Sequence, residues 1–213
     1  DMILARLTRP ENLKGLLSSE RFDASGLEHL LPRLSLEAYD PLLEALSSSP
    51  SRIVRRRLLD LLGRTPVDIS PLIIARLTDE RWYVQRNMLT LLARSRSMPQ
   101  SFSVMPWTHH ADPRVRSEAI RLQLLLPHER DVAVDAALSD ADPRIVHLGL
   151  TAMGDTASPR LLDRVIDLAL TSDLGEDTRL LAVNSLTRAR RADVLDALLQ
   201  LSGGGRSIFG RIR

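Results

Sequence analysis

The chain has no cysteine among its 213 residues, which excludes disulfides, thiolate nucleophiles and thiolate-bound metals. Aromatic residues make up only 3% of the sequence, although 44% of it is apolar. The core must therefore be built from Leu, Val, Ile and Ala, a composition that suits helices better than strands. Lysine is also nearly absent, since Lys14 is the single lysine among 29 basic residues.

Long apolar runs are missing as well. No run approaches the roughly 18 residues that a membrane span needs, and the first residues do not form a signal peptide. We therefore expect a cytoplasmic protein. The formal net charge is only +2, which does not by itself predict binding to nucleic acid.

Catalytic and metal-binding motifs are absent too. The sequence contains no His-Glu-x-x-His, no Gly-x-Ser-x-Gly, no phosphate-binding loop and no dinucleotide fingerprint. The adjacent histidines His109 and His110 do not have the spacing of a zinc site. We expect no catalytic residue, no cofactor and no metal.

The strongest feature that is present is a repeat of about thirty residues. Each copy opens a helix, and an apolar residue marks an equivalent place that we call the anchor position. The first four anchors are Val54, Val84, Val115 and Ile145, which are 30, 31 and 30 residues apart, and a fifth copy follows about 33 residues later near Thr178. A repeat of this length is typical of helical hairpins that bury their apolar faces by stacking on their neighbours.

Each copy predicts two helices. From the anchor position, apolar or small residues recur at the fourth, seventh and eighth places, which predicts a second helix with one apolar face. First helices are expected at the same period, starting near Pro41, Pro71, Ser101, Asp131, Arg160 and Asp193. Four helix starts carry a capping residue followed by proline at the first helical position. These pairs are Asp40-Pro41, Ser70-Pro71, Asp112-Pro113 and Asp142-Pro143.

These patterns predict an all-α fold, an α-solenoid of about six stacked antiparallel helix pairs. Residues 1–35 are expected to form divergent capping helices, and residues 36–201 the solenoid itself. Residues 202–213 begin with a glycine-rich linker, and we interpret the tail after it as a connector.

The runs Asp-Glu-Arg-Trp-Tyr-Val-Gln-Arg-Asn at 79–87 and Asp-Pro-Arg-Val-Arg at 112–116 resemble bacterial HEAT-like repeats. These include the phycobilisome lyase-type HEAT repeats of the armadillo-like superfamily. The resemblance covers residues 36–201 and implies a right-handed superhelix whose second helices line the concave face. It also implies an arginine directly after each anchor, paired with aspartates between repeats. This chain has Arg55 and Arg116 there, but Gln85 and Val146 in the other two copies.

Helical geometry places the residues one, two and six positions after the anchor on the side away from the core. They form a row that we interpret as the binding face of a non-catalytic protein scaffold or adaptor. The proposed contacts are Arg55, Arg56, Arg86, Arg116, Arg121 and His147, with Val146 beside them.

Three alternatives remain open. The row is a solvated face if Asp60, Asp79 and Glu118 neutralise its arginines. It binds nucleic-acid phosphates, as the concave faces of HEAT-like DNA glycosylases do, if aromatic side chains assist it. The aromatic candidates are Trp82, Tyr83 and Trp107, although packing between repeats explains the first two equally. The resemblance to lyase-type repeats adds bilin lyase activity as a third possibility.

Overall fold

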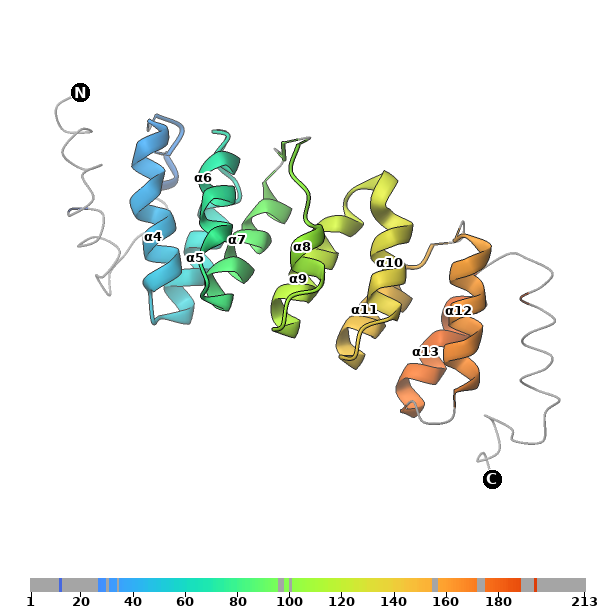
Figure 1. Cartoon of the computed structure of the whole chain (residues 1–213). Coiled ribbons are helices and arrows are strands. Elements are labelled where there is room, and N and C mark those ends of the chain that lie inside the picture. The colour runs from blue at the N-terminus through green and yellow to red at the C-terminus, as the bar shows by residue number, and fades with distance from the viewer. Residues whose placement is uncertain are drawn as a thin grey trace. The chain divides into compact units, whose positions relative to one another are not determined.

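The computed structural model describes residues 12, 27–29, 31–33, 35–95, 98–99, 101–154, 157–171, 175–188 and 194. Within these residues all regular secondary structure is helical (Figure 1). The predicted all-α fold is therefore confirmed.

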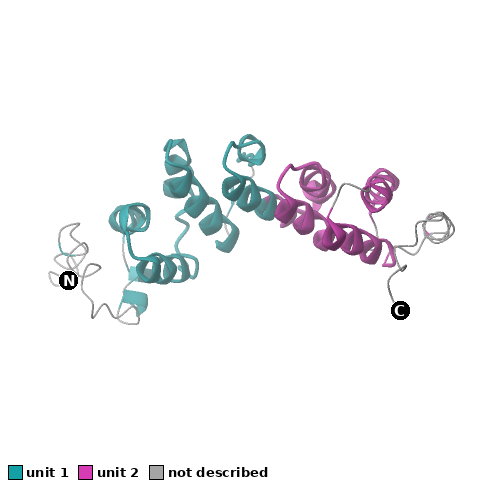
Figure 2. Cartoon of the chain, turned by 90° about the horizontal axis from the view of Figure 1, so that it is seen from below, with its two compact units in different colours: residues 1–122 teal, residues 123–213 magenta. Residues whose placement is uncertain are grey.

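The chain divides into two compact units, residues 1–122 and residues 123–213 (Figure 2). Each unit has its own cluster of buried apolar side chains. The capping helices predicted at 1–35 lie largely outside the described residues, and the tail at 202–213 lies wholly outside them.

The first unit holds two short 3-10 helices, η1 (Leu31–Arg33) and η2 (Leu36–Tyr39), before its α-helices. The α-helices that follow are α4 (Asp40–Ser48), α5 (Arg52–Leu62), α6 (Ser70–Ala75), which η3 (Arg76–Thr78) continues, α7 (Trp82–Arg94), α8 (Met105–Thr108) and α9 (Pro113–Leu124), which ends just past the boundary between the units. The second unit contains η4 (Pro127–Glu129), α10 (Arg130–Leu138), α11 (Pro143–Ala152), α12 (Pro159–Leu170) and α13 (Glu176–Leu186).

Successive helices pair into antiparallel hairpins, and hairpins within a unit pack on one another (Figure 1). In the first unit α4 pairs with α5 and α6 with α7, while α7 also packs against α4 and α5. In the second unit α10 pairs with α11, and α12 pairs with α13. The first helices of these two hairpins, α10 and α12, contact each other, and so do the second helices, α11 and α13. Each unit therefore buries its apolar faces between neighbouring hairpins, as short repeats must.

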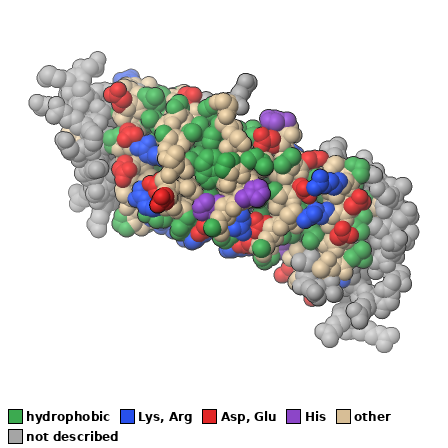
Figure 3. All heavy atoms as spheres, viewed as in Figure 1, with side chains coloured by type: hydrophobic (Ala, Val, Ile, Leu, Met, Phe, Trp, Pro, Cys, Tyr) green, Lys and Arg blue, Asp and Glu red, His purple; other side chains and the backbone are tan. Residues whose placement is uncertain are grey.

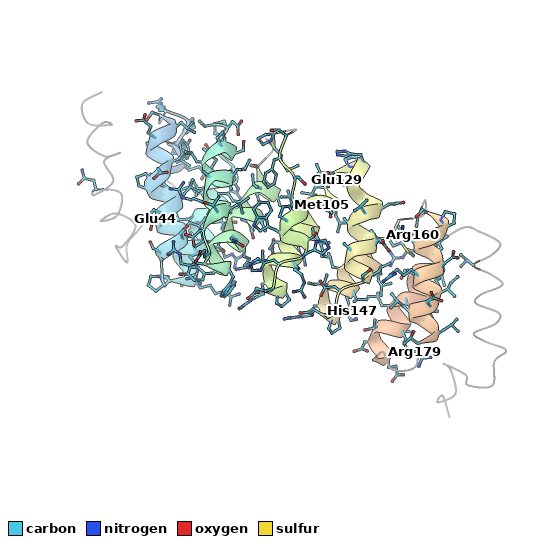
Figure 4. All side chains as sticks on the ribbon, viewed as in Figure 1. Glu44, Met105, Glu129, His147, Arg160 and Arg179 are labelled. Atoms are coloured by element: carbon cyan, nitrogen blue, oxygen red, sulfur yellow. The ribbon has the colours of Figure 1, made fainter. Side chains whose placement is uncertain are left out.

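Polar contacts also join neighbouring hairpins. In the first unit Arg76 binds Asp40 at 2.6 Å and Arg94 binds Asp60. In the second unit Arg160 on α12 binds Asp135 on α10 at 3.0 Å (Figure 4). Because at least one side chain of each pair is exposed to solvent, each pair contributes at most about 1 kcal/mol and adds to the packing without replacing it.

The burial pattern confirms the second helices and fixes the register of the fifth copy. Val84, Val115 and Ile145 are buried at the anchor position, as predicted. Thr178 is only 6% exposed, and the residues four, seven and eight places after it, Ala182, Ser185 and Leu186, are buried with it. Thr178 is therefore the fifth anchor, 33 residues after Ile145.

Small residues allow close helix approach at two places. A Cβ added to Gly149 on α11 would lie 2.8 Å from the Cβ of Ala137 on α10. A Cβ added to Gly63, directly after α5, would lie 2.9 Å from the Cβ of Arg94 on α7. Neither helix pair can keep its present spacing with a larger residue there.

The capping prediction is right at two helix starts and wrong at two. The carboxylates of Asp112 and Asp142 each accept from the backbone N–H two residues later. Asp40 and Ser70 do not cap, because α4 and α6 already include them. The carboxylate of Asp40 instead accepts a hydrogen bond from Arg76.

The first helix predicted from Ser101 is displaced and reduced to one turn. Only Met105–Thr108 is helical, and the described residues before it form a turn at Ser101 and then chain without regular secondary structure. Pro106 has no N–H to donate and disfavours helical geometry in the residue before it, so a helix cannot run through this segment from Ser101.

Candidate functional site

In four of the five copies, the side chain directly after the anchor donates a hydrogen bond to a backbone carbonyl oxygen that precedes its helix. We call this place the loop-binding position; it is occupied by Arg55, Gln85, Arg116, Val146 and Arg179. Arg55 Nη1 donates to the carbonyl oxygens of Ser49 at 2.7 Å and Pro50 at 2.9 Å. Arg116 Nη1 donates to those of His110 at 2.9 Å and Ala111 at 3.0 Å.

The other two polar members of this position act in the same way. Gln85 Nε2 donates to the carbonyl oxygen of Asp79 at 2.7 Å. Arg179, labelled in Figure 4, donates from Nε to the carbonyl oxygen of Ala169 at 3.3 Å. Each side chain thus satisfies backbone acceptors in the segment that leads into its own helix. Arg55 and Arg116, which the sequence assigns to partner binding, have this structural role.

The fourth copy departs from the predicted row. Val146 is only 6% exposed, so its placement on the outer side was wrong. An apolar side chain at the edge of the buried stripe gains more from packing on the core than from facing water. His147 is half-buried, and its Nε2 lies 2.8 Å from Oγ1 of Thr178, the buried fifth anchor.

In three of the predicted arginines the guanidinium group has no hydrogen-bond or ion-pair partner among the described residues: Arg56 on α5, Arg86 on α7 and Arg121 on α9. Arg56 and Arg121 are exposed and Arg86 is half-buried. Arg56 and Arg86 occupy the same place, two residues after the anchor, on second helices that pack against each other. Two guanidinium groups without a partner among the described residues therefore occupy equivalent positions on neighbouring second helices of the first unit.

The acidic residues suggested as local counter-charges bind elsewhere. Asp60 pairs with Arg94, and Asp79 pairs with Arg81. Neither of these arginines belongs to the predicted row. The observed contacts of Asp60 and Asp79 thus leave the charges of Arg56 and Arg86 available to a ligand.

Arginines two residues after a loop aspartate form a second recurring contact. The guanidinium donates from Nε and Nη2 to the carboxylate, a bidentate geometry, and the backbone N–H of the arginine donates to the same aspartate. The pairs are Asp79–Arg81, Asp112–Arg114 and Asp142–Arg144. The hydrogen bond from Arg81 lowers the pKa of Asp79, and that from Arg114 lowers the pKa of Asp112. Arg81, Arg114 and Arg144 therefore stabilise the starts of their own helices.

The aromatic side chains predicted as contacts each pack against a neighbouring side chain. The guanidinium carbon of Arg114 lies 3.4 Å from the ring centroid of Trp82, and this half-buried ring packs against the core of the first unit. Trp82 thereby connects the starts of α7 and α9, a packing role between repeats. Tyr83 meets Trp82 edge to face, with centroids 5.7 Å apart.

Trp107 belongs to the irregular third hairpin. Its ring stacks on Phe102 with centroids 5.7 Å apart, and both rings are half-buried. Met105, labelled in Figure 4, and Pro106 are exposed beside them. Figure 3 shows apolar side chains gathered on the face of the first unit that is turned to the viewer.

One feature of the face that carries Arg56 and Arg86 was predicted only in part, since the sequence named Tyr83 as a possible contact but not Ile53. The residue before the anchor is apolar and exposed in the first two copies, with Ile53 65% exposed and Tyr83 39% exposed. Both precede an unpaired arginine by three residues, Arg56 and Arg86 respectively. Side chains three residues apart share a helix face. The sequence contained this alternation, but burial was needed to show that Ile53 faces water.

Some kinds of site find no support in the described residues. No group of three or more histidine or acidic side chains there is arranged to hold a metal ion. Within the same residues, no helix has both the length and the apolar character needed to cross a bilayer.

Comparison with known proteins does not place the chain in a family: no protein-family model matches it, and no curated protein matches it either.

Proposed function

We propose that this chain is a non-catalytic scaffold or adaptor, a HEAT-like, armadillo-like solenoid that binds another protein on the face formed by its second helices. Arg56 and Arg86 are the central contacts, and Arg121 extends the surface along α9. The proposed location, the bacterial cytoplasm, follows from the sequence and its resemblance to bacterial repeats alone.

The observation that carries the proposal is the contrast between neighbouring arginines. Arg55 is engaged with the carbonyl oxygens of Ser49 and Pro50, whereas Arg56 has no partner among the described residues. The same contrast separates Gln85 from Arg86. A guanidinium that supports no contact in its own fold is suited to a carboxylate on another molecule, which it binds with two parallel hydrogen bonds.

Nucleic acid is the alternative partner, because the same groups bind phosphates. Two observations favour protein. The formal net charge is only +2, whereas binding to a phosphate backbone goes with a clear basic excess. Arg114 also covers one face of Trp82, and Trp107 stacks on Phe102, so neither ring is set out as an open platform for bases.

A direct test uses fluorescence anisotropy with two labelled probes, a polyglutamate peptide and a short DNA duplex. The test variant is R56E/R86E, and the matched control is R33E/R188E. The control changes the net charge equally at two exposed arginines that lie on neither α5 nor α7. We expect wild type and control to bind polyglutamate, and R56E/R86E to lose about tenfold or more in affinity, equivalent to about 1.4 kcal/mol.

The result that overturns the proposal is equal loss in both double variants, which would reduce the effect to net charge. Tighter binding to the duplex than to polyglutamate, with affinity falling steeply as salt rises, would establish the nucleic-acid alternative instead.

A further inference from the structure

We infer that the partner of this face is a protein segment in which acidic side chains alternate with apolar ones. This inference rests on the proposed function and adds the chemistry of the partner. It is carried by two parallel pairs of residues on α5 and α7: the unpaired Arg56 and Arg86, and the exposed Ile53 and Tyr83.

The two pairs form two short rows. Along each helix the apolar residue precedes the arginine by three places, a rise of about 4.5 Å, and both point to the same side. The two helices pack against each other, and the axes of packed helices are usually about 8–10 Å apart. A segment that crosses α5 and α7 therefore meets an apolar row on one edge and a cationic row on the other.

An extended peptide presents a different edge to each of the two rows. Its successive side chains point to opposite edges, so acidic residues alternating with apolar ones place carboxylates toward Arg56 and Arg86 and apolar groups toward Ile53 and Tyr83. Charge complementarity selects this occupant over a purely apolar segment, because a partner lacking carboxylates would leave both guanidinium groups without ligands. It also selects against nucleic acid, whose backbone offers nothing apolar to Ile53.

The ring of Tyr83 is held in place by two neighbouring side chains. Its ring meets Trp82 edge to face, and the guanidinium of Arg81 lies 5.7 Å from its centroid. Arg81 is itself fixed by Asp79 at 2.7 Å. The ring is therefore supported from within the first unit while 39% of the residue stays exposed, a preorganised apolar surface that loses little conformational freedom on binding.

The experiment compares two labelled peptides of equal length and charge, one alternating Glu with Leu and the other alternating Glu with Ser. Wild type is expected to bind the Glu-Leu peptide about fivefold to tenfold more tightly, because only that peptide removes Ile53 and Tyr83 from water. The variant I53S/Y83S is expected to lose this preference and to keep its affinity for the Glu-Ser peptide.

Two control variants test whether the preference depends specifically on Ile53 and Tyr83. L36S/M105S removes exposed apolar residues elsewhere in the first unit and is expected to keep the preference. I53S alone, at the most exposed of these positions, is expected to reduce the preference without a change in helical content by circular dichroism, even if Tyr83→Ser disturbs folding.

The outcomes separate this inference from the proposed function. If wild type binds both peptides equally and R56E/R86E loses both, the inference is wrong and the acidic-partner proposal stands. If wild type binds neither peptide, both are wrong. Loss of preference in L36S/M105S as well would also overturn the inference, since any exposed apolar residue would then serve.

Discussion

At the scale of single residues, adjacent arginines on one helix have opposite roles. Arg55 turns back to the segment before α5 and satisfies two carbonyl oxygens. Arg56 faces water with no partner among the described residues. The difference follows from their angular positions, because 100° of rotation moves one side chain beside the loop and the next away from it.

This contrast predicts different effects on stability. Arg55→Met should lower the free energy of unfolding by about 1 kcal/mol, since it leaves the carbonyls of Ser49 and Pro50 without their donor. Arg56→Met should change it by less than about 0.5 kcal/mol, as for other exposed side chains without contacts. Urea denaturation followed by circular dichroism measures both. Equal effects of the two substitutions would contradict the structural role of Arg55.

At the scale of helices and loops, the starts of the second helices are fixed by repeated local contacts. Asp112 caps α9 and binds Arg114 through both carboxylate oxygens. Asp142 does the same for α11 with Arg144. In each case the aspartate also lies near the positive end of the helix dipole. Each contact therefore combines a cap, an ion pair and the dipole at one helix end.

These contacts predict an acid-dependent loss of stability. Arg114 lowers the pKa of Asp112 in the folded protein, so the ionised carboxylate stabilises the fold above its ordinary pKa. That contribution is lost as pH falls through the lowered value, below about pH 4. Asp112→Asn keeps a capping oxygen but loses the charge. It should cost about 0.5–1 kcal/mol at neutral pH and flatten the decline in unfolding free energy below pH 4.

The matched control is Asp163→Asn on α12, an exposed carboxylate with no partner among the described residues. Chemical denaturation at a series of pH values should show an unchanged slope for this variant. An unchanged slope for Asp112→Asn as well would mean that its ion pair with Arg114 does not persist in solution.

At the scale of the whole molecule, the chain holds two compact units with separate buried clusters. Leu62 is fully buried in the first cluster and Leu150 in the second. The sequence contains two tryptophans, Trp82 and Trp107, and both belong to the first unit. Tryptophan fluorescence therefore reports on one unit, whereas circular dichroism reports on both.

This asymmetry gives a test of whether the units unfold separately. Leu150→Ala should cost about 2–4 kcal/mol through the cavity it leaves, and should lower the urea midpoint seen by circular dichroism more than the midpoint seen by fluorescence. Leu62→Ala, a substitution of the same kind in the first unit, should lower the fluorescence midpoint. Coincident transitions by both probes in both variants would show one cooperative unit.

The sequence predicts the helices well because their apolar periodicity depends only on local geometry. Val84, Val115 and Ile145 are buried where the repeat placed them. It does not predict side chains whose orientation depends on loop shape, as at Arg55 and Arg116. It also placed the start of the third first helix at Ser101 from the repeat period, whereas the helix begins at Met105, directly before Pro106. Of the predicted site, the structure leaves Arg56, Arg86 and Arg121 unengaged among the described residues, and one partner-binding surface remains a proposal.

The length of the arginine side chain has a consequence for how such repeats tolerate insertion. Arg55 reaches carbonyls five and six residues back, while Arg179 reaches Ala169, ten residues back, across the longer connection between α12 and α13. The arginine side chain is thus long enough to reach a backbone carbonyl oxygen across connections of different length. An arginine directly after the anchor is accordingly expected to hold the start of its helix even when the number of residues before that helix changes.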